Sequence, residues 1–217
     1  MAQLATGAWA RAAVNHPQLE KLTIIEINPG YLELLQDYPE YAALLDHPKI
    51  ELIIDDGRRW LHTTDRKFDF VLSNSTFNFR AMASNLLSVD FIRLLKEHLE
   101  PGGVVTINTT GSMRVAASVR EVLPHGYLFL RSTYASPDPI DFDRKRLLRV
   151  LRDYRIDGEP LLDLSNPRHR ERLREIDLLL QVAPQNPNIK PLSEVPQLPV
   201  ITDDNMGTEF EVDLLGL

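Results

Sequence analysis

Short apolar runs that alternate with amphipathic segments are the feature that most restricts the fold of this chain. The runs are rich in β-branched residues and short enough to be buried strands. They are Lys21–Ile27, Ile50–Ile54, Phe68–Leu72, Val104–Ile107 and Tyr127–Thr133. The segments between them have helical spacing and are Ala8–Val14, a helix opened by Pro29 and broken at Pro39, Ser88–Leu99 and Met113–Val122. Strands that alternate with helices need crossover connections, so we expect an α/β fold with a mixed or mostly parallel sheet.

The character of the chain changes after Pro137. Asp141–Tyr154 and Pro167–Leu180 have the pattern of charged amphipathic helices. Residues 182–199 contain five prolines and no clear period, which predicts an extended connector. We therefore divide the chain into a Rossmann-like domain at 1–136 and a helical and extended region at 137–217 that packs on the same domain.

The composition excludes several classes of function. A net charge of -7 argues against a nucleic acid partner, since such proteins usually present a basic face. No apolar run approaches the roughly 20 residues of a membrane-spanning helix, so we expect no membrane insertion by this chain. The chain has no cysteine, which fits a cytoplasmic protein, and its six histidines lack the spacing of metal ligands.

Polar residues follow three of the predicted strands. These residues are Glu26, Asp56 and Asn74. Ligands of parallel α/β sheets bind beyond the carboxyl ends of the strands, where a carboxylate can accept hydrogen bonds from ribose hydroxyls. The alternative is that Glu26 is a solvated acid and that Asp55-Asp56-Gly57 is a plain turn, which these residue types favour.

The order and spacing of these strand ends resemble the spermidine synthase group within the class I S-adenosylmethionine-dependent methyltransferase fold. The residues that carry the resemblance are Thr6-Gly7, Glu26-Ile27-Asn28-Pro29, Asp56-Gly57-Arg58-Arg59-Trp60-Leu61, Phe68-Asp69-Phe70-Val71, Leu99-Glu100-Pro101-Gly102-Gly103 and Thr202-Asp203-Asp204-Asn205. The resemblance implies a Rossmann-like three-layer α/β/α fold with a helical C-terminal extension.

The resemblance also implies a nucleoside site. By it, Glu26 would bind the ribose hydroxyls, Asp56 would accept from the adenine amino group, and Gly57 would let the backbone approach the ligand closely. Thr6 and Gly7 would form the end of the glycine-rich loop that holds the cofactor. The cofactor would be S-adenosylmethionine or its decarboxylated form.

Two elements of the family pattern are missing from this sequence. The first strand and the small N-terminal β domain of the aminopropyltransferases have no counterpart here. Loss of a central strand exposes the edges of its two neighbours, so we expect self-association as a homo-oligomer. Only Thr6-Gly7 remain of the glycine-rich loop, which leaves open a second interpretation, in which the chain is a non-catalytic or truncated relic that acts as a binding or assembly module.

The third departure concerns the chemistry. Spermidine synthases carry an aspartate after the fourth strand that helps to deprotonate the attacking amine, and Asn74 stands at that position. An amide cannot take a proton from an ammonium group. We therefore favour methyl transfer over aminopropyl transfer, with Asn74 positioning the acceptor. The alternative role for Asn74 is to cap the following loop.

Further residues are candidates for contact with a small-molecule acceptor, for which an amine is one candidate. Phe77 and Arg80 lie in a segment with the composition of an active-site lid, although its aromatics can equally pack under the next helix. Asp203 and Asp204 can form an anionic rim for a cationic amine, or remain solvated. The sequence thus predicts a spermidine-synthase-like transferase.

Overall fold

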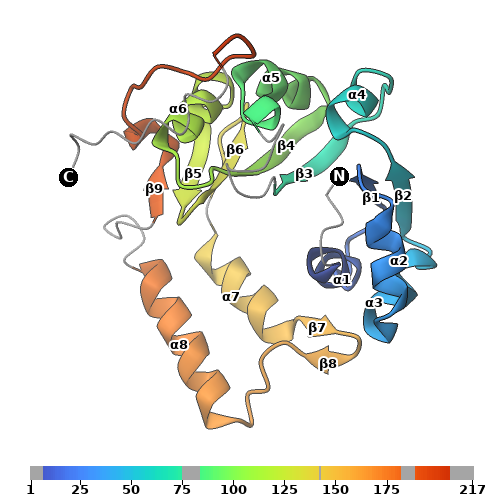
Figure 1. The fold of residues 1–217 in the computed structure, drawn as a ribbon. Helices are drawn as coiled ribbons and strands as arrows, with labels where there is room; N and C mark the ends of the chain where they lie inside the picture. The colour runs from blue at the N-terminus through green and yellow to red at the C-terminus, as the bar shows by residue number, and fades with distance from the viewer. Residues whose placement is uncertain (1–6, 75–83, 142, 182–188, 206–217) are drawn as a thin grey trace. The chain divides into compact units, whose positions relative to one another are not determined.

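The computed structural model describes residues 7–74, 84–141, 143–181 and 189–205 (Figure 1). The chain divides into two compact units, each built from two separate stretches of sequence. One unit comprises Gly57–Ile140 and Pro187–Leu217, and the other comprises Ala2–Asp56 and Asp141–Asn186. We call them unit 1 and unit 2. The division at 136–137 stays a prediction, and the two units are described separately below.

Unit 1 is built on a five-stranded mixed sheet. Its strands are β3 (Phe68–Ser73), β4 (Leu99–Asn108), β5 (His125–Phe129), β6 (Ser132–Ser136) and β9 (Ile189–Pro191). Their order in the sheet is β3-β4-β6-β5-β9. The β3–β4 pair is parallel, whereas β4–β6, β5–β6 and β5–β9 are antiparallel. The two polar strand ends after Ser73 and at Asn108 therefore lie at the same edge.

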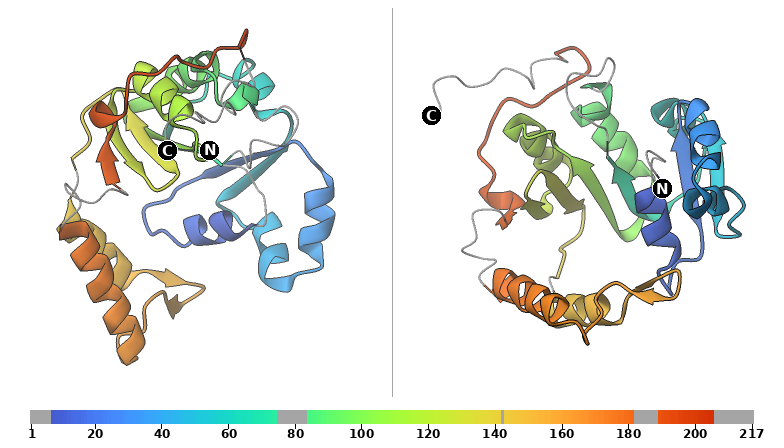
Figure 2. Two further views of the ribbon diagram at one scale, coloured as in Figure 1. Left: turned by 60° about the vertical axis from the view of Figure 1, so that its left-hand side comes forward. Right: turned by 60° about the horizontal axis from the view of Figure 1, so that its bottom comes forward.

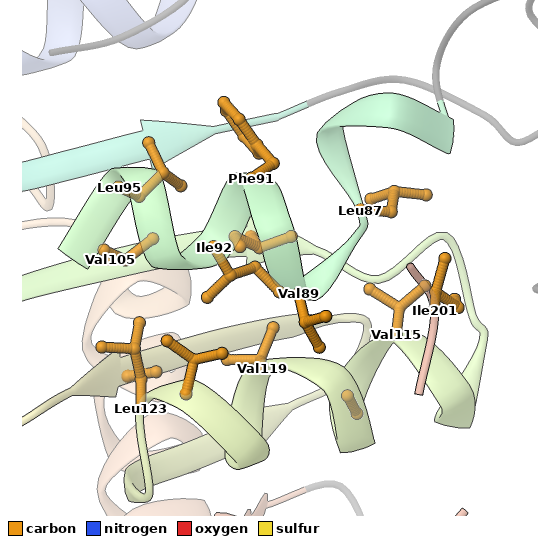
Figure 3. Close-up of a cluster of buried hydrophobic side chains, with 14 of the residues drawn as sticks. Leu87, Val89, Phe91, Ile92, Leu95, Val105, Val115, Val119, Leu123 and Ile201 are labelled. Carbon is orange, nitrogen blue, oxygen red and sulfur yellow. The ribbon is translucent and has the colours of Figure 1, made fainter. Parts of the chain in front are cut away.

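Two helices pack together over this sheet and form the core of unit 1. The helical elements of the unit are α4 (Gly57–Leu61), the 3-10 turn η1 (Ser84–Leu86), α5 (Val89–Glu97), α6 (Met113–Val122) and the 3-10 turn η3 (Leu192–Glu194). Ser88 and Ser112 cap α5 and α6 by accepting from the backbone N–H three residues on. Figure 3 shows the apolar side chains of α5 and α6 meeting over β4, with Ile201 beside them.

The C-terminal segment of unit 1, residues 189–205, covers that core. Leu192, Val195 and Ile201 are almost fully buried in it. The Ile201 carbonyl accepts from the Val89 N–H at 2.8 Å, and the Ile201 N–H donates to Ser118 Oγ at 2.8 Å. The segment is thus hydrogen-bonded to α5 and to α6, which explains how an aperiodic stretch can be ordered.

Unit 2 begins with a parallel pair of strands and three helices. The elements are α1 (Ala8–Val14), β1 (Leu22–Glu26), α2 (Gly30–Gln36), α3 (Pro39–Leu45) and β2 (Ile50–Ile54). The strands run in register from Leu22 opposite Ile50 to Glu26 opposite Ile54. All five residues of β1 are buried, as its apolar sequence predicts. Pro39 stands at the start of α3, so the predicted break at this proline is confirmed.

The second stretch of unit 2 is a helical hairpin with a small ribbon. It contains α7 (Arg144–Asp153), β7 (Arg155–Ile156), β8 (Glu159–Pro160) and α8 (Pro167–Gln181). Helices α7 and α8 lie side by side (Figures 1 and 2), and Arg144 of α7 forms an ion pair of 2.7 Å with Asp177 of α8. Arg11 and Asn15 bind Asp157, which ties the ribbon to α1.

One predicted strand is wrong. Residues 127–133 form no single strand, because the chain turns back at Leu130 and Arg131 and makes the hairpin β5–β6. Leu130 has a φ of 55°, a conformation that leucine rarely adopts and that glycine or asparagine usually provides in such turns. Because leucine stands there instead, no residue type in the sequence marks the turn. Gly126 does mark the hairpin, since a Cβ there would lie 1.9 Å from the Tyr134 carbonyl oxygen.

A second difference concerns β4, which is longer than predicted. The Pro101-Gly102-Gly103 stretch was expected to lie between a helix and a strand, but α5 ends at Glu97 and β4 already begins at Leu99. Phe68 pairs with Leu99 and Phe70 pairs with Val104, so the intervening residues of β4 bulge out of register. The bulge brings the Gly103 Cα close to the Glu100 and Phe68 carbonyl oxygens, where a Cβ would sit within 3.0 Å of both.

The strands at the ends of the sheets have an unpaired edge in the described part of the chain. There, β1 pairs with β2 alone, and β3 stands at the end of its sheet. The expectation that a missing strand exposes its two neighbours stays a prediction. Self-association through such edges stays a prediction. None of the described helices is both long and apolar enough to cross a membrane.

Candidate nucleoside-binding site

The carboxyl edge of the β1–β2 pair carries the acids predicted from the sequence. Glu26 is the last residue of β1 and stands opposite Ile54, the last residue of β2. The Asp55 N–H donates to the Glu26 carbonyl oxygen at 3.1 Å. The parallel pairing therefore brings Glu26 and the Asp55-Asp56 pair to one edge of unit 2, where ligands of parallel sheets bind.

Glu26 is held in place by the turn that follows it. The residue is only 6% exposed, and its Oε1 accepts from the Asn28 N–H at 3.0 Å. Asn28 in turn accepts from the Gly30 N–H at 3.0 Å, which starts α2. An ionised carboxylate has about four acceptor positions, so this hydrogen bond leaves Glu26 further capacity for ligand hydroxyls.

Asp56 and Gly57 join β2 to α4. Gly57 is the first residue of α4, and a Cβ built on it would meet no other atom within 4 Å. Nothing in the packing of the described residues therefore requires glycine here, which contrasts with Gly103. A glycine that the fold does not need is consistent with close approach of a ligand to the backbone.

Gly7 has a structural reason to be glycine. It is buried at the N-terminus of α1 with a φ of 77°, and a Cβ there would lie 3.1 Å from Tyr41 Cδ1. Its left-handed conformation and tight packing account for glycine without a ligand. A cofactor-binding role for Gly7 stays a prediction, and Thr6 lies outside the described residues.

Asn74 is part of a pair of amides in unit 1. Asn108, the last residue of β4, donates from Nδ2 to Asn74 Oδ1 at 3.0 Å, and Asn108 Oδ1 accepts from the Thr110 N–H at 2.9 Å. These contacts fix the Asn74 amide with its oxygen toward Asn108, which turns its NH₂ group away as a donor. Asn108 was not among the residues predicted from the sequence, although the expected parallel pairing of its strand with Phe68–Leu72 would place it near Asn74.

Asp203 forms an ion pair with Arg58 within unit 1. Arg58 donates from both terminal nitrogens to the two oxygens of the Asp203 carboxylate, with Nη1 at 2.9 Å from Oδ1. Ser88 Oγ donates to the same Oδ1 at 2.6 Å. The hydrogen bonds from Arg58, aided by that from Ser88, hold the pKa of Asp203 below its ordinary value despite partial burial.

The remaining acceptor candidates are placed differently. Asp204 is exposed beside Asp203, and its place on an anionic rim stays a prediction. Phe77 and Arg80 lie outside the described residues. Because the Asp203 carboxylate is already engaged by Arg58 and Ser88, its first role in unit 1 is to hold the C-terminal segment against α4 and α5.

The mixed α/β architecture with polar residues at its strand ends is that of a class I methyltransferase-like fold. Comparison with solved structures confirms this fold. A spermidine synthase solved with the transition-state analogue AdoDATO superimposes with a TM-score of 0.58 and 19% identity, over 81% of this chain and 68% of that one. Human methyltransferase-like protein 13 in complex with SAH gives a TM-score of 0.52 and 14% identity, over 68% of this chain and 76% of that one.

The family follows from the sequence comparison. A model of the spermine/spermidine synthase domain matches residues 5–126, which is more than half of the chain. The chain belongs to the spermine/spermidine synthase family. The resemblance drawn from the strand-end motifs is therefore confirmed.

Curated relatives are similar over part of their length. Spermidine synthase of Dictyostelium discoideum is 33% identical over 100 residues, which make up 46% of this chain and 35% of that protein. Polyamine aminopropyltransferase 2 of Hyperthermus butylicus is 29% identical over 131 residues, or 58% of this chain and 43% of that protein. The matches thus span less than half the length of these relatives.

Proposed function

We propose that the chain binds the adenosyl part of an S-adenosyl nucleoside at the carboxyl edge of β1 and β2. The observation that carries this proposal is the Glu26 carboxylate, buried and fixed beside Asp55-Asp56 by the parallel pairing. Carboxylate oxygens accept hydrogen bonds only, which suits ribose hydroxyls and an exocyclic amino group. The residues at this edge therefore fit the nucleoside that the family uses.

The proposed reaction is aminopropyl transfer to a small amine. Membership of the family and the names of the curated relatives support this reaction, and they do not support the preference for methyl transfer that rested on Asn74. A decarboxylated S-adenosylmethionine donor supplies the electrophilic aminopropyl carbon next to its sulfonium sulfur. The chain contributes binding and orientation at this site, through Glu26 to the ribose and Asp56 to the adenine.

Methyl transfer remains the second candidate because of the amide pair in unit 1. Asn108 holds the Asn74 carbonyl oxygen, and the Asn74 NH₂ group makes no hydrogen bond among the described residues, so it can orient an acceptor atom with a lone pair. It accepts no proton from an ammonium group, which leaves deprotonation of an amine to the solvent. A transfer to an atom that is already nucleophilic has less need of a base.

Titration calorimetry with three nucleosides tests the proposal. Decarboxylated S-adenosylmethionine, S-adenosylmethionine and methylthioadenosine are titrated into the wild type and into Asp56→Ala. We expect the decarboxylated form to bind in preference to S-adenosylmethionine, and Asp56→Ala to weaken binding about 10-fold or more. The matched control is Glu33→Ala, which removes an exposed carboxylate from α2 in the same unit.

Each result has a distinct meaning. Preference for S-adenosylmethionine would favour methyl transfer. Equal affinity of wild type and Asp56→Ala would remove Asp56 from the site. Absence of binding by all three nucleosides would refute the proposed site and favour a chain that acts as a binding or assembly module.

A further inference from the structure

A pocket in unit 2 shares no residue with the proposed nucleoside site. It lies between residues 15–17, which follow α1, and the second half of α7 with the start of β7, and its volume is about 420 Å³. Pockets of small metabolites have volumes of roughly 300–1,000 Å³. The pocket is therefore large enough for a small organic molecule.

The walls of this pocket carry an excess of positive charge. Arg146, Arg149 and Arg155 line it, and Asp153 is the acid among the lining residues. The chain as a whole has a net charge of -7, so this excess runs against the background. A local surplus of positive charge on an acidic protein favours an anionic ligand.

Two of these arginines lack the partners that their neighbours have. Arg11 pairs with Asp157, Arg144 with Asp177 and Arg172 with Glu175. By contrast, the side chains of Arg146 and Arg149 make no hydrogen bond or ion pair with other described residues of the chain. Both arginines belong to α7 and are three residues apart on one helical face, where like charges repel.

The wall formed by residues 15–17 offers a further donor. Tyr154 donates its hydroxyl proton to the Ala12 carbonyl, and its ring lies 6.1 Å from the His16 ring, centroid to centroid. His16 Nδ1 accepts from the Gln18 N–H at 3.2 Å, which places the proton of a neutral imidazole on Nε2. The His16 side chain is thus fixed as a donor in the same pocket as the arginines.

From these observations we propose that the pocket binds a small organic oxyanion with two negative charges. Guanidinium groups match the planar oxygen pairs of carboxylates and phosphates, which makes them suited to this class of ligand. Three arginines against one aspartate give a surplus of two positive charges, which a doubly charged ligand neutralises. The apolar Val150 and Pro17 in the same walls favour an organic carrier over a bare ion.

The test uses the full chain and two probes, glycerol phosphate and succinate, which separate a phosphate ester from a dicarboxylate. Binding is measured by titration calorimetry at low salt for the wild type and for the double variant R146Q/R149Q. The matched control is K145Q/R152Q, which removes the same charge from α7 at exposed positions outside the pocket. We expect one probe to bind, R146Q/R149Q to weaken it by about 10-fold or more, and the control to change it by about 2-fold or less.

Two outcomes would overturn the site. One is that neither probe binds the wild type. The other is that both double variants lose affinity equally, which would show general attraction to α7 rather than a pocket. If R146Q/R149Q fails to fold by circular dichroism, the single variant R155Q takes its place, and retention of full affinity in R155Q would count against the proposal.

Discussion

Arg58 in α4 donates hydrogen bonds to both carboxylate oxygens of Asp203, 145 positions further along the chain. The guanidinium also donates to the Asn85 carbonyl, and the Asp203 N–H donates to Asp90 Oδ2 at 3.0 Å. One ion pair thus joins α4, the start of α5 and the C-terminal segment. Two-pronged pairs of this type are among the stronger polar contacts in proteins.

Asp203→Asn should destabilise the protein at neutral pH. The substitution keeps the shape of the side chain but removes the charge that Arg58 binds. Because the Asp203 side chain is 38% exposed, we expect a loss of about 1 kcal/mol, below the range for buried charged pairs. Urea denaturation measures the change. Asp204→Asn is the control and should leave the midpoint unchanged, and an equal effect of both variants would contradict the role of the pair.

The contribution of Asp203 should depend on pH with a defined sign. Its pKa in the folded protein is lowered, chiefly by Arg58, so the unfolded chain binds the proton more readily. The stabilisation is complete above the ordinary aspartate pKa of about 3.9 and is lost as the pH falls through the lower folded value. The stability difference between wild type and Asp203→Asn should therefore shrink from pH 7 to pH 3. A difference that stays constant over this range would show that the charge is not responsible.

Glu26→Gln should weaken nucleoside binding while preserving the turn after β1. The Gln carbonyl oxygen can still accept from the Asn28 N–H, as Glu26 Oε1 does. The negative charge that strengthens hydrogen bonds from ribose hydroxyls is lost, so we expect affinity to fall about 10-fold. Calorimetry measures the affinity and thermal denaturation checks the fold. A variant that keeps both affinity and stability would exclude Glu26 from the site.

Gly57→Ala should weaken nucleoside binding without lowering the stability of the fold. A Cβ at Gly57 meets no atom within 4 Å, and alanine is the better helix former at the first position of α4. We expect unchanged or slightly raised thermal stability together with weaker nucleoside binding. Gly103→Ala is the contrasting variant, since its Cβ would lie 2.8 Å from the Glu100 carbonyl oxygen, and it should lower stability. Undiminished nucleoside affinity in Gly57→Ala would mean that the ligand does not approach this residue.

Asn74→Asp should raise aminopropyl transfer. The Asn108 NH₂ group that now donates to Asn74 Oδ1 can donate equally to a carboxylate, so the geometry is preserved. A carboxylate at this position can accept the proton of the attacking amine, and general bases contribute about 10²–10⁴-fold to a rate. Product formation from decarboxylated S-adenosylmethionine and an amine measures the effect. Asn108→Asp places the same charge on β4, and an equal gain there would show that Asn74 has no special position.

Local sequence was sufficient where a short stretch determines its own structure. The apolar run of β2 predicted Ile50–Ile54, and the helical spacing predicted α1 and α6, each with the observed bounds. The neighbouring positions of Glu26 and Asp56 also followed, because parallel strands end at one edge. In all these cases the periodicity of burial is visible in fewer than about a dozen residues.

The sequence was insufficient where tertiary contacts override local preference. The turn at Leu130 has no glycine or asparagine signal, and the pairing of β6 with β4 stabilises it. The ion pair of Arg58 with Asp203 joins residues that no local pattern relates. The same holds for Asn74 and Asn108, which 34 positions separate. Such contacts depend on the register of the whole sheet rather than on any one segment.

The interleaving of the two units has a consequence for the order in which the protein can form during synthesis. The first stretch of unit 2 leaves the ribosome before any of Gly57–Ile140, but its partner stretch follows only afterwards. Unit 1 is completed last, because Ile201, which packs between α5 and α6, is made after every helix of the protein that the structure describes. Both nascent units must therefore hold an incomplete core while the other's residues are translated, which lengthens the time during which apolar surface is available to chaperones.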